Sequence, residues 1–426
     1  MKALGLLGSI AGLLLLRQPL LVILLAAAAC VHLFWGRGNL EDIVEDMWVG
    51  LDKEVILSIP LFILCGAAMT RGSIAQRLIR ILAAATKPLP GGLAVATILS
   101  CAVFAAISGS SIVTMLAIGS VMYPAMRQAG YDNKFSLGAI MSGGTLGIII
   151  PPSIPMIIYG LVTETSVTDL FAAGFGPGLL ITLALSAYAV WFNWGMQTAA
   201  FNVAEFWLAF KDGVWAALMP VILLGGIYSG YFTATEAAAV ALVYALAVEI
   251  FIYKELRPVD FYNVVLETSK LGGSLFPLIA VALSLNIILI EHRVPQSLVE
   301  FMQGYIASPV MFMILVNVLL LIVGCLMTTG EAILVLAPLL APLAESYGYN
   351  KVLFGLIMIL NLEIGYLTPP VGLNLIVAMG AFKQSFGLLC RAAVPFILIM
   401  FACLIIVIWQ PWIAMYLVTG KFWLGG

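Results

Sequence analysis

The chain has 426 residues, of which 63% are hydrophobic and only 9% are charged. Because a soluble domain normally carries roughly a quarter charged residues, this composition is typical of a protein whose main solvent is lipid. The formal net charge of −2 argues against a nucleic-acid partner, which would require a basic surface.

Seven segments are long and apolar enough to cross a bilayer, since a membrane-spanning helix needs about 20 mostly apolar residues. In chain order they are residues 20–36, 55–72, 170–193, 214–232, 234–253, 273–291 and 393–416. Residues 3–36 as a whole are expected to lie in the membrane, with a break at Arg17-Gln18-Pro19. Amphipathic arms at 40–54 and 258–272 are expected to lie in the interface. The predicted class is an all-α polytopic membrane protein that contacts the lipid bilayer.

Four further apolar segments depart from this simple pattern. Residues 93–123 and 308–343 are too long for one span and have polar centres, so they are predicted to form re-entrant hairpins. Residues 135–162 and 353–380 are interrupted by the pairs Pro151-Pro152 and Pro369-Pro370. Because proline lacks an N–H group and bends a helix, these two segments are predicted to be broken helices.

The chain repeats itself when it is shifted by 218 positions. This shift superposes Gly147 on Gly365 and the first proline pair on the second, and such residues mark backbone geometry rather than lipid solubility. Five crossings separate the two predicted hairpins, which places them on opposite faces and predicts inverted repeats, as in many secondary transporters. Beyond residue 60, twelve basic residues fall on one face and three on the other, in agreement with the positive-inside rule.

These elements divide the chain into five parts. Residues 1–54 carry an N-terminal membrane helix and an arm, 55–195 the first repeat, 196–272 scaffold helices and the second arm, 273–392 the second repeat, and 393–426 a C-terminal membrane helix. Glycine, proline and serine are concentrated in the hairpins and broken helices, whereas spans 214–232 and 234–253 are smoother. We therefore expect the hairpins and broken helices to move as one body against a static scaffold, in an elevator motion.

The breaks and hairpin tips carry groups suited to a cation and to an anion. Proline frees backbone carbonyls about a turn earlier, and carbonyl and hydroxyl oxygens are the ligands with which unwound transporter helices coordinate Na⁺. Helix N-termini at the same places favour an anionic substrate. The hydroxyl candidates are Ser108, Ser110, Ser111, Thr328, Thr329 and Thr368. Glu331 and Glu363 lie in apolar surroundings nearby, and a carboxylate at that depth is a functional candidate.

Other classes of site are poorly supported by the sequence. The six cysteines all lie in apolar runs, and neither a CxxC motif nor a Cys/His cluster occurs, so a metal site or disulfide framework is not indicated. His32 and His292 lie in unrelated segments, and HExxH and GxSxG motifs are absent. A membrane enzyme is therefore the most distant alternative, and no cofactor other than a coupling Na⁺ is expected.

Several motifs together resemble the large membrane subunit of the tripartite ATP-independent periplasmic (TRAP) transporters, over residues 40 to 415. The motifs are Ile59-Pro60-Leu61-Phe62, Pro90-Gly91-Gly92-Leu93-Ala94, Ile107-Ser108-Gly109-Ser110, Ile150-Pro151-Pro152-Ser153, Thr235-Glu236-Ala237-Ala238 and Leu367-Thr368-Pro369-Pro370-Val371-Gly372-Leu373-Asn374. The resemblance implies a Na⁺-driven elevator carrier. One departure concerns Thr114, which stands where that family often has an acidic residue.

The resemblance also implies site residues. One sodium site would use Ser108, Gly147, Ile150 and Pro152, and a second would use Gly324, Gly365, Thr368 and Val371, mostly through carbonyl oxygens. Ser110 would face the substrate between the two sites. The further substrate candidates are Ser111, Thr328, Thr329 and Asn374.

The implied partners are a separate small membrane subunit of about four spans and a periplasmic substrate-binding protein. The implied setting is the inner membrane of a bacterium or archaeon, and the implied substrates are small organic anions such as dicarboxylates, keto acids or sialic acid. An alternative stays open: a carrier of related architecture that works alone, driven by Na⁺ or H⁺.

Overall fold

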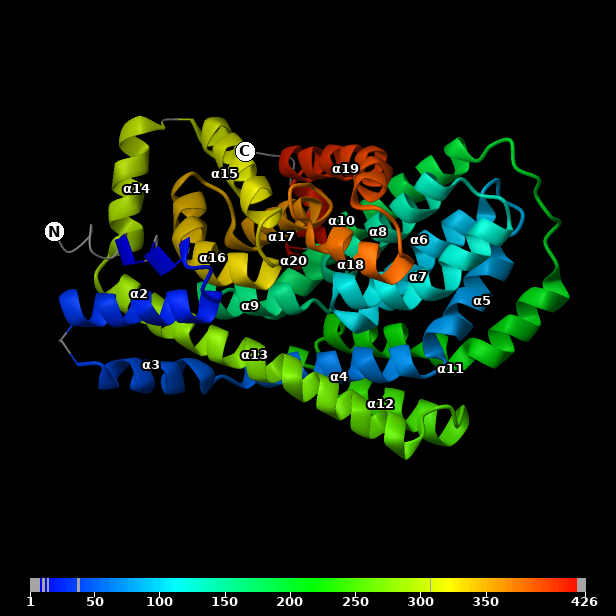
Figure 1. The fold of residues 1–426 in the computed structure, drawn as a ribbon, viewed down its shortest axis with the longest axis horizontal. Coiled ribbons are helices and arrows are strands. Elements are labelled where there is room, and N and C mark those ends of the chain that lie inside the picture. The colour runs from blue at the N-terminus through cyan, green and yellow to red at the C-terminus, as the bar shows by residue number, and fades with distance from the viewer. Residues whose placement is uncertain (1–7, 10–11, 14, 37–38, 307, 420–426) are drawn as a thin grey trace.

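The computed structural model describes residues 8–9, 12–13, 15–36, 39–306 and 308–419. The described residues form helices and connecting loops without a strand, and eight of the helices are long and apolar enough to cross a membrane (Figure 1). The predicted all-α membrane class is therefore confirmed. Parts of the expected N-terminal segment 3–36 and of the C-terminal part 393–426 lie outside the described residues.

The N-terminal elements follow the predicted spans closely. Helix α2 (Leu20–Phe34) is an apolar helix of 15 residues within the predicted span 20–36. Helix α3 (Glu41–Leu51) is the amphipathic arm, and η1 (Glu54–Leu57) leads into α4 (Ser58–Arg71). Helix α5 (Ile74–Thr86) was not predicted. Arg77 and Arg80 interrupt its apolar sequence, so it lacks the long apolar run by which a membrane span is recognised.

The first predicted hairpin consists of α6 (Gly92–Ser108) and α7 (Ser111–Gln128). Gly109 ends α6 with φ of +61°, a conformation that glycine adopts without the steric cost that a side chain brings. The following broken helix consists of α8 (Asn133–Ile149) and α9 (Ile154–Thr163), separated at the proline pair. Two consecutive residues without an N–H group cannot continue the helical hydrogen bonds, so the helix ends there.

The middle of the chain contains long helices. They are α10 (Val167–Phe192), α11 (Val203–Tyr228), α12 (Ala234–Ala247) with its π-helical extension η2 (Val248–Ile252), and α13 (Pro258–Glu291). The expected separate arm 258–272 and span 273–291 form this single helix of 34 residues. Pro258 at its first turn needs no helical donor, and the backbone hydrogen bonds continue through the change from polar to apolar sequence. At 1.5 Å per residue the helix is about 51 Å long, which exceeds the roughly 30 Å hydrocarbon core.

The second half of the chain contains a short helix, a hairpin and a broken helix. After α14 (Val294–Tyr305), the hairpin is formed by α15 (Pro309–Gly324) and α16 (Thr329–Ser346), and the broken helix by α17 (Lys351–Tyr366) and α18 (Leu373–Phe382). The expected span 393–416 is instead divided into α19 (Phe386–Trp409) and α20 (Trp412–Thr419). The residue before a proline is disfavoured in the helical conformation, and Gln410 before Pro411 has a non-helical backbone with ψ of 72°.

The helix bounds repeat with the same shift that superposes the sequence motifs. Helix α16 begins and ends 218 residues after α7, and α17 begins 218 residues after α8. Asp132 caps α8 with its side chain as Asn350 caps α17, and Gly130 and Gly348 both have positive φ before these caps. In both halves, therefore, a glycine with positive φ and a side-chain cap precede the helix that leads to the break.

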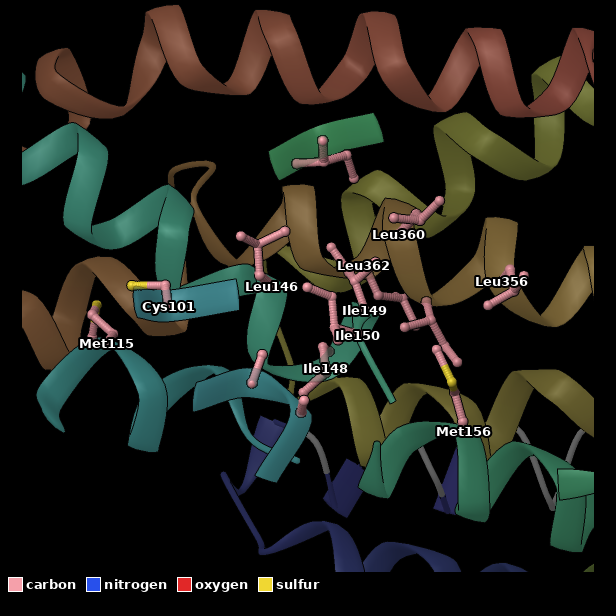
Figure 2. Close-up of a cluster of buried hydrophobic side chains, with 14 of the residues drawn as sticks. Cys101, Met115, Leu146, Ile148, Ile149, Ile150, Met156, Leu356, Leu360 and Leu362 are labelled. Atoms are coloured by element: carbon pink, nitrogen blue, oxygen red, sulfur yellow. The ribbon is translucent and has the colours of Figure 1, made fainter. Parts of the chain in front are cut away.

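Helices α3, α4, α12 and α13 pack together on one side of the molecule, and the hairpins and broken helices lie on the other (Figure 1). The first break and α17 share one apolar core. In this core Ile149 and Ile150 lie beside Leu362, with Met156 and Leu356 further along (Figure 2).

Candidate functional site

A cavity of about 470 Å³ is lined by the tips of both hairpins. The opposite wall is formed by α4 and α13, so the cavity lies between the two packed groups of helices. The lining includes residues 108–113 of the first tip, residues 328–330 of the second tip, Ala67 and Thr70 of α4, Glu267 and Leu271 of α13, and Glu363 and Tyr366 of α17.

The first tip packs against the first break. The Gly109 carbonyl accepts a hydrogen bond from the Ile154 N–H (3.3 Å). A Cβ atom on Gly147 would lie 2.4 Å from the Ser110 carbonyl oxygen, so only glycine permits this approach. The Ser108 hydroxyl lies 2.6 Å from the Thr114 hydroxyl. Thr114, which departs from the family pattern, therefore belongs to the same cluster of oxygens as Ser108.

Ile150 and Pro152 are the two other residues of the first predicted sodium site. A Cβ atom on Gly178 of α10 would lie 2.5 Å from the Ile150 side chain, so that side chain packs on α10. Ile150 therefore offers a cation its backbone carbonyl oxygen and not its side chain. The Pro152 carbonyl oxygen lies 3.3 Å from the position of a Cβ atom on Gly109, which places it at the hairpin tip.

The second tip packs against the second break in a corresponding way. A Cβ atom on Gly365 would lie 2.5 Å from the Gly324 carbonyl carbon, and the Cys325 carbonyl accepts a hydrogen bond from the Gly372 N–H (3.1 Å). The Thr368 hydroxyl donates to the Ile364 carbonyl (2.8 Å), so its lone pairs remain for a cation. Val371 lies in the same break, between α17 and α18.

Four of the five predicted substrate residues line the cavity, namely Ser110, Ser111, Thr328 and Thr329. Asn374 instead lies behind the lining, fully buried, where its Oδ1 accepts a hydrogen bond from the Ser111 hydroxyl (3.2 Å). Through this bond the first tip is joined to α18. Asn374 therefore contacts the cavity lining through Ser111 and does not line the cavity itself.

Glu331 has a structural explanation. Its carboxylate accepts a hydrogen bond from the Thr328 N–H (3.0 Å), and the Thr328 hydroxyl accepts one from the Glu331 N–H (3.3 Å). This reciprocal capping box closes the N-terminus of α16. The N-terminus of α7 carries a simpler cap, in which the Ser110 side chain accepts a hydrogen bond from the Val113 N–H.

Two residues of α17 also line the cavity: Glu363, which the sequence marks as a functional candidate, and Tyr366, which was not predicted. The Tyr366 hydroxyl accepts a hydrogen bond from the Thr329 N–H (2.5 Å), which fixes the second tip. Glu363 is fully buried, with Oε1 3.5 Å from the Thr329 hydroxyl and with Oε2 lacking a hydrogen-bond partner among the described residues. Their spacing of three residues places both side chains on one helix face, a pattern that can be recognised in the sequence.

Basic groups around the cavity are already paired. Arg71 forms an ion pair with Glu267 (3.0 Å) that joins the end of α4 to α13 at the cavity edge. Arg71 is the basic residue of the described lining. Hydrogen-bond donors and helix N-termini are therefore the other groups of the described lining that suit an anion.

The chain matches the family model described as "Tripartite ATP-independent periplasmic transporter, DctM component" over residues 7–413. It is 39% identical over 402 residues to the C4-dicarboxylate TRAP transporter large permease protein DctM of Pseudomonas aeruginosa, covering 94% of this chain and 93% of that protein. It is 37% identical to the isethionate TRAP transporter permease protein DctMQ of Oleidesulfovibrio alaskensis, covering 93% of this chain and 63% of that longer protein.

Among solved structures, the fold is similar to the YdaH transporter of Alcanivorax borkumensis. The TM-score is 0.65 at 12% identity, covering 92% of this chain and 91% of that one. At this low identity the likeness concerns the fold alone.

Proposed function

Because the chain belongs to the DctM-component family of tripartite ATP-independent periplasmic transporters, we propose that it carries small organic anions across the inner membrane and that Na⁺ drives the transport. Membership confirms the identity suggested by the sequence motifs. The family is a transporter permease and not an enzyme, as predicted.

Relatives support the substrate class. Their names specify C4-dicarboxylate, isethionate and 2,3-diketo-L-gulonate, all small and rich in oxygen. The cavity of about 470 Å³ has room for a molecule of this size, and its hydroxyl groups are suitable partners for carboxylate oxygens. We propose a carboxylate of the C4-dicarboxylate kind as substrate.

The sodium proposal rests on one observation. Each hairpin tip is held against a proline break through a glycine that admits no side chain, Gly147 in the first half and Gly365 in the second. Such contacts bring carbonyl and hydroxyl oxygens together, in buried surroundings at the first break and in partly exposed ones at the second. Na⁺ is bound by oxygen ligands of this kind at unwound transporter helices.

The proposed partners are a small membrane subunit and a periplasmic binding protein that delivers the substrate. Support comes from the tripartite family. Further support comes from the relative named DctMQ, of which this chain spans 63%.

The proposal is tested by uptake of radiolabelled fumarate, a C4-dicarboxylate, into proteoliposomes. They would contain this chain with a small membrane subunit and a periplasmic binding protein of the same organism. Uptake is expected with an inward Na⁺ gradient and is expected to disappear when K⁺ replaces Na⁺ at constant pH. Uptake sustained by a proton gradient without Na⁺ would contradict sodium coupling, and uptake without either partner would contradict the tripartite assembly.

A further inference from the structure

Helix α5 begins without a cap of its own. Ser73 at its N-cap position makes no side-chain capping hydrogen bond in the described structure, and the first turn lacks an acidic residue. The cap comes from a distant helix. Glu249 of η2 accepts hydrogen bonds through Oε1 from the N–H groups of Ser73 and Ile74, both at 2.8 Å. A carboxylate at a helix N-terminus satisfies free donors and interacts favourably with the helix dipole.

The Glu249 carboxylate occupies the space that a side chain at position 72 would fill. Glu249 is fully buried, and a Cβ atom on Gly72 would lie 2.1 Å from its carboxyl carbon. Any side chain at position 72 would therefore displace Glu249 from the start of α5. A buried carboxylate with these two bonds is a specific contact between α5 and the α12 span rather than a solvated surface charge.

Basic residues along α5 and at its C-terminal end form ion pairs with α11. Arg77 forms an ion pair with Asp212, Arg80 approaches Asp212 at 3.6 Å, and Lys87 approaches Glu205 at 2.6 Å. The pairs of Arg80 and Lys87 are exposed and contribute little individually, whereas the Arg77 side chain is only 15% exposed. Three ion pairs along one helix nevertheless define how α5 lies against α11.

The other end of α5 is tied to the first hairpin. The Thr86 hydroxyl donates to the carbonyl of Gly92, the first residue of α6, at 2.7 Å. The Leu93 N–H donates to the Tyr131 hydroxyl at 3.2 Å, between the start of α6 and the turn after α7. Helix α5 therefore connects the α11–α12 pair with the hairpin whose tip lines the cavity.

We propose that Glu249 is a positioning residue for transport: it holds the first turn of α5 on α11 and α12, and through α5 it sets the position of the hairpin α6–α7. Glu249 does not touch the cavity, so its effect is on movement of the hairpin and not on substrate contacts. This inference rests on the proposed transport function.

The test compares Glu249→Ala with Glu249→Gln in the fumarate uptake assay. Glu249→Gln keeps an acceptor oxygen and is expected to retain a Vmax within about twofold of wild type. Glu249→Ala leaves two buried donors unpaired and is expected to lower Vmax at least about tenfold with KM for fumarate unchanged. A wild-type Vmax for Glu249→Ala, or a loss confined to KM, would overturn the inference.

Gly72 provides an independent approach to the same contact. Gly72→Ala is expected to reproduce the loss, because its Cβ atom displaces the carboxylate. The double variant Gly72→Ala with Glu249→Ala is expected to be no worse than Glu249→Ala alone. Gly225→Ala in α11 is the matched control, since among the described residues nothing lies within 4 Å of its added Cβ. Additive losses in the double variant would overturn the inference.

Amide hydrogen exchange gives a measurement that needs no substrate. Exchange of residues 73–77 is expected to be at least about tenfold faster in Glu249→Ala and Gly72→Ala, and unchanged in Glu249→Gln and Gly225→Ala. Unchanged exchange in Glu249→Ala would overturn the anchoring. If wild-type protein failed to take up fumarate, the proposed function would be contradicted, while the exchange result would still decide whether Glu249 anchors α5.

Discussion

At the residue scale, the two tip–break contacts depend on the absence of side chains at Gly147 and Gly365. The added Cβ atoms would lie 2.4 Å from the Ser110 carbonyl oxygen and 2.5 Å from the Gly324 carbonyl carbon. Backbone atoms cannot give way as a flexible side chain can. Each substitution must therefore separate the hairpin tip from the break.

Gly147→Ala and Gly365→Ala are each expected to raise the Na⁺ concentration for half-maximal uptake at least about tenfold, which corresponds to roughly 1.4 kcal/mol. The reason is that the displaced carbonyls no longer form the oxygen cluster. Gly380→Ala in α18 is the matched control, because nothing in the described structure lies within 4 Å of its Cβ. Wild-type sodium dependence in both variants would mean that the breaks are ordinary kinks.

Tyr366 supplies a second prediction for single residues. Tyr366→Phe removes the acceptor of the buried Thr329 N–H, and an unsatisfied buried donor costs about 1–3 kcal/mol. We expect faster amide exchange at residues 328–331 and a lower Tm. The control is Tyr231→Phe, whose side chain is 84% exposed. Equal exchange in the two variants would contradict a role of Tyr366 in holding the second tip.

At the element scale, the N-terminus of α16 is closed by Thr328 and Glu331. Replacing Glu331 with Ala opens one side of the capping box, at a cost of about 0.5–2 kcal/mol, whereas Gln retains the acceptor. Thermal unfolding in detergent is expected to show a lower Tm for Glu331→Ala and a near wild-type Tm for Glu331→Gln. A Tm lowered equally in both variants would indicate that the negative charge of Glu331, rather than its acceptor oxygen, is needed.

The arm α3 carries a pH-dependent contact. Burial raises the pKa of Asp46, and Glu291, Asp42 and Glu45 raise it further, while His32, whose Nε2 lies 3.5 Å from the carboxylate, lowers it. A carboxyl whose pKa is raised on folding contributes stability below its ordinary value of 3.8, and this contribution is lost as pH rises through the raised value.

Wild-type Tm is accordingly expected to fall as pH rises from about 4 towards neutrality, and Asp46→Asn is expected to reduce that fall. The comparison requires thermal unfolding of both proteins over the same pH series. Parallel curves for the two proteins would show that Asp46 does not titrate with folding.

At the scale of the whole molecule, the cavity lies between the hairpin tips and the α4–α13 pair. A carrier that moves its hairpins and broken helices as one body must change the contacts across this boundary. Contacts within the packed group of α3, α4, α12 and α13 should remain constant during that movement.

This motion predicts the effect of crosslinks made in a background without the six native cysteines. Val113 of the first tip and Ala67 of α4 both line the cavity. A reducible thiol-specific crosslinker that joins Val113→Cys to Ala67→Cys across the cavity is expected to stop uptake, and its reduction is expected to restore uptake. Glu54→Cys with Thr235→Cys is the control within the static group, where the Thr235 hydroxyl donates to the Glu54 carbonyl (3.2 Å). Uptake that survives the first crosslink would contradict the elevator motion.

Much of the architecture could be predicted from the sequence because it depends on local properties. Hydropathy marks the spans, and the proline pairs mark both breaks. The helices α5 and α14 escaped prediction because they are too polar or too short to be recognised as spans. The prediction of a separate arm at 258–272 was wrong, because these residues are the first part of α13. A change from polar to apolar residues does not interrupt backbone hydrogen bonds.

By itself the sequence determined the all-helical membrane class, the repeated motifs and the hydroxyl groups at the hairpin tips, because hydropathy, glycine and proline act within a few residues. Tertiary structure alone decided which of these groups meet. Ser111 and Asn374 are 263 positions apart, and Glu249 lies 176 positions from Ser73. Such contacts depend on how whole helices pack, and no pattern of neighbouring residues records that packing.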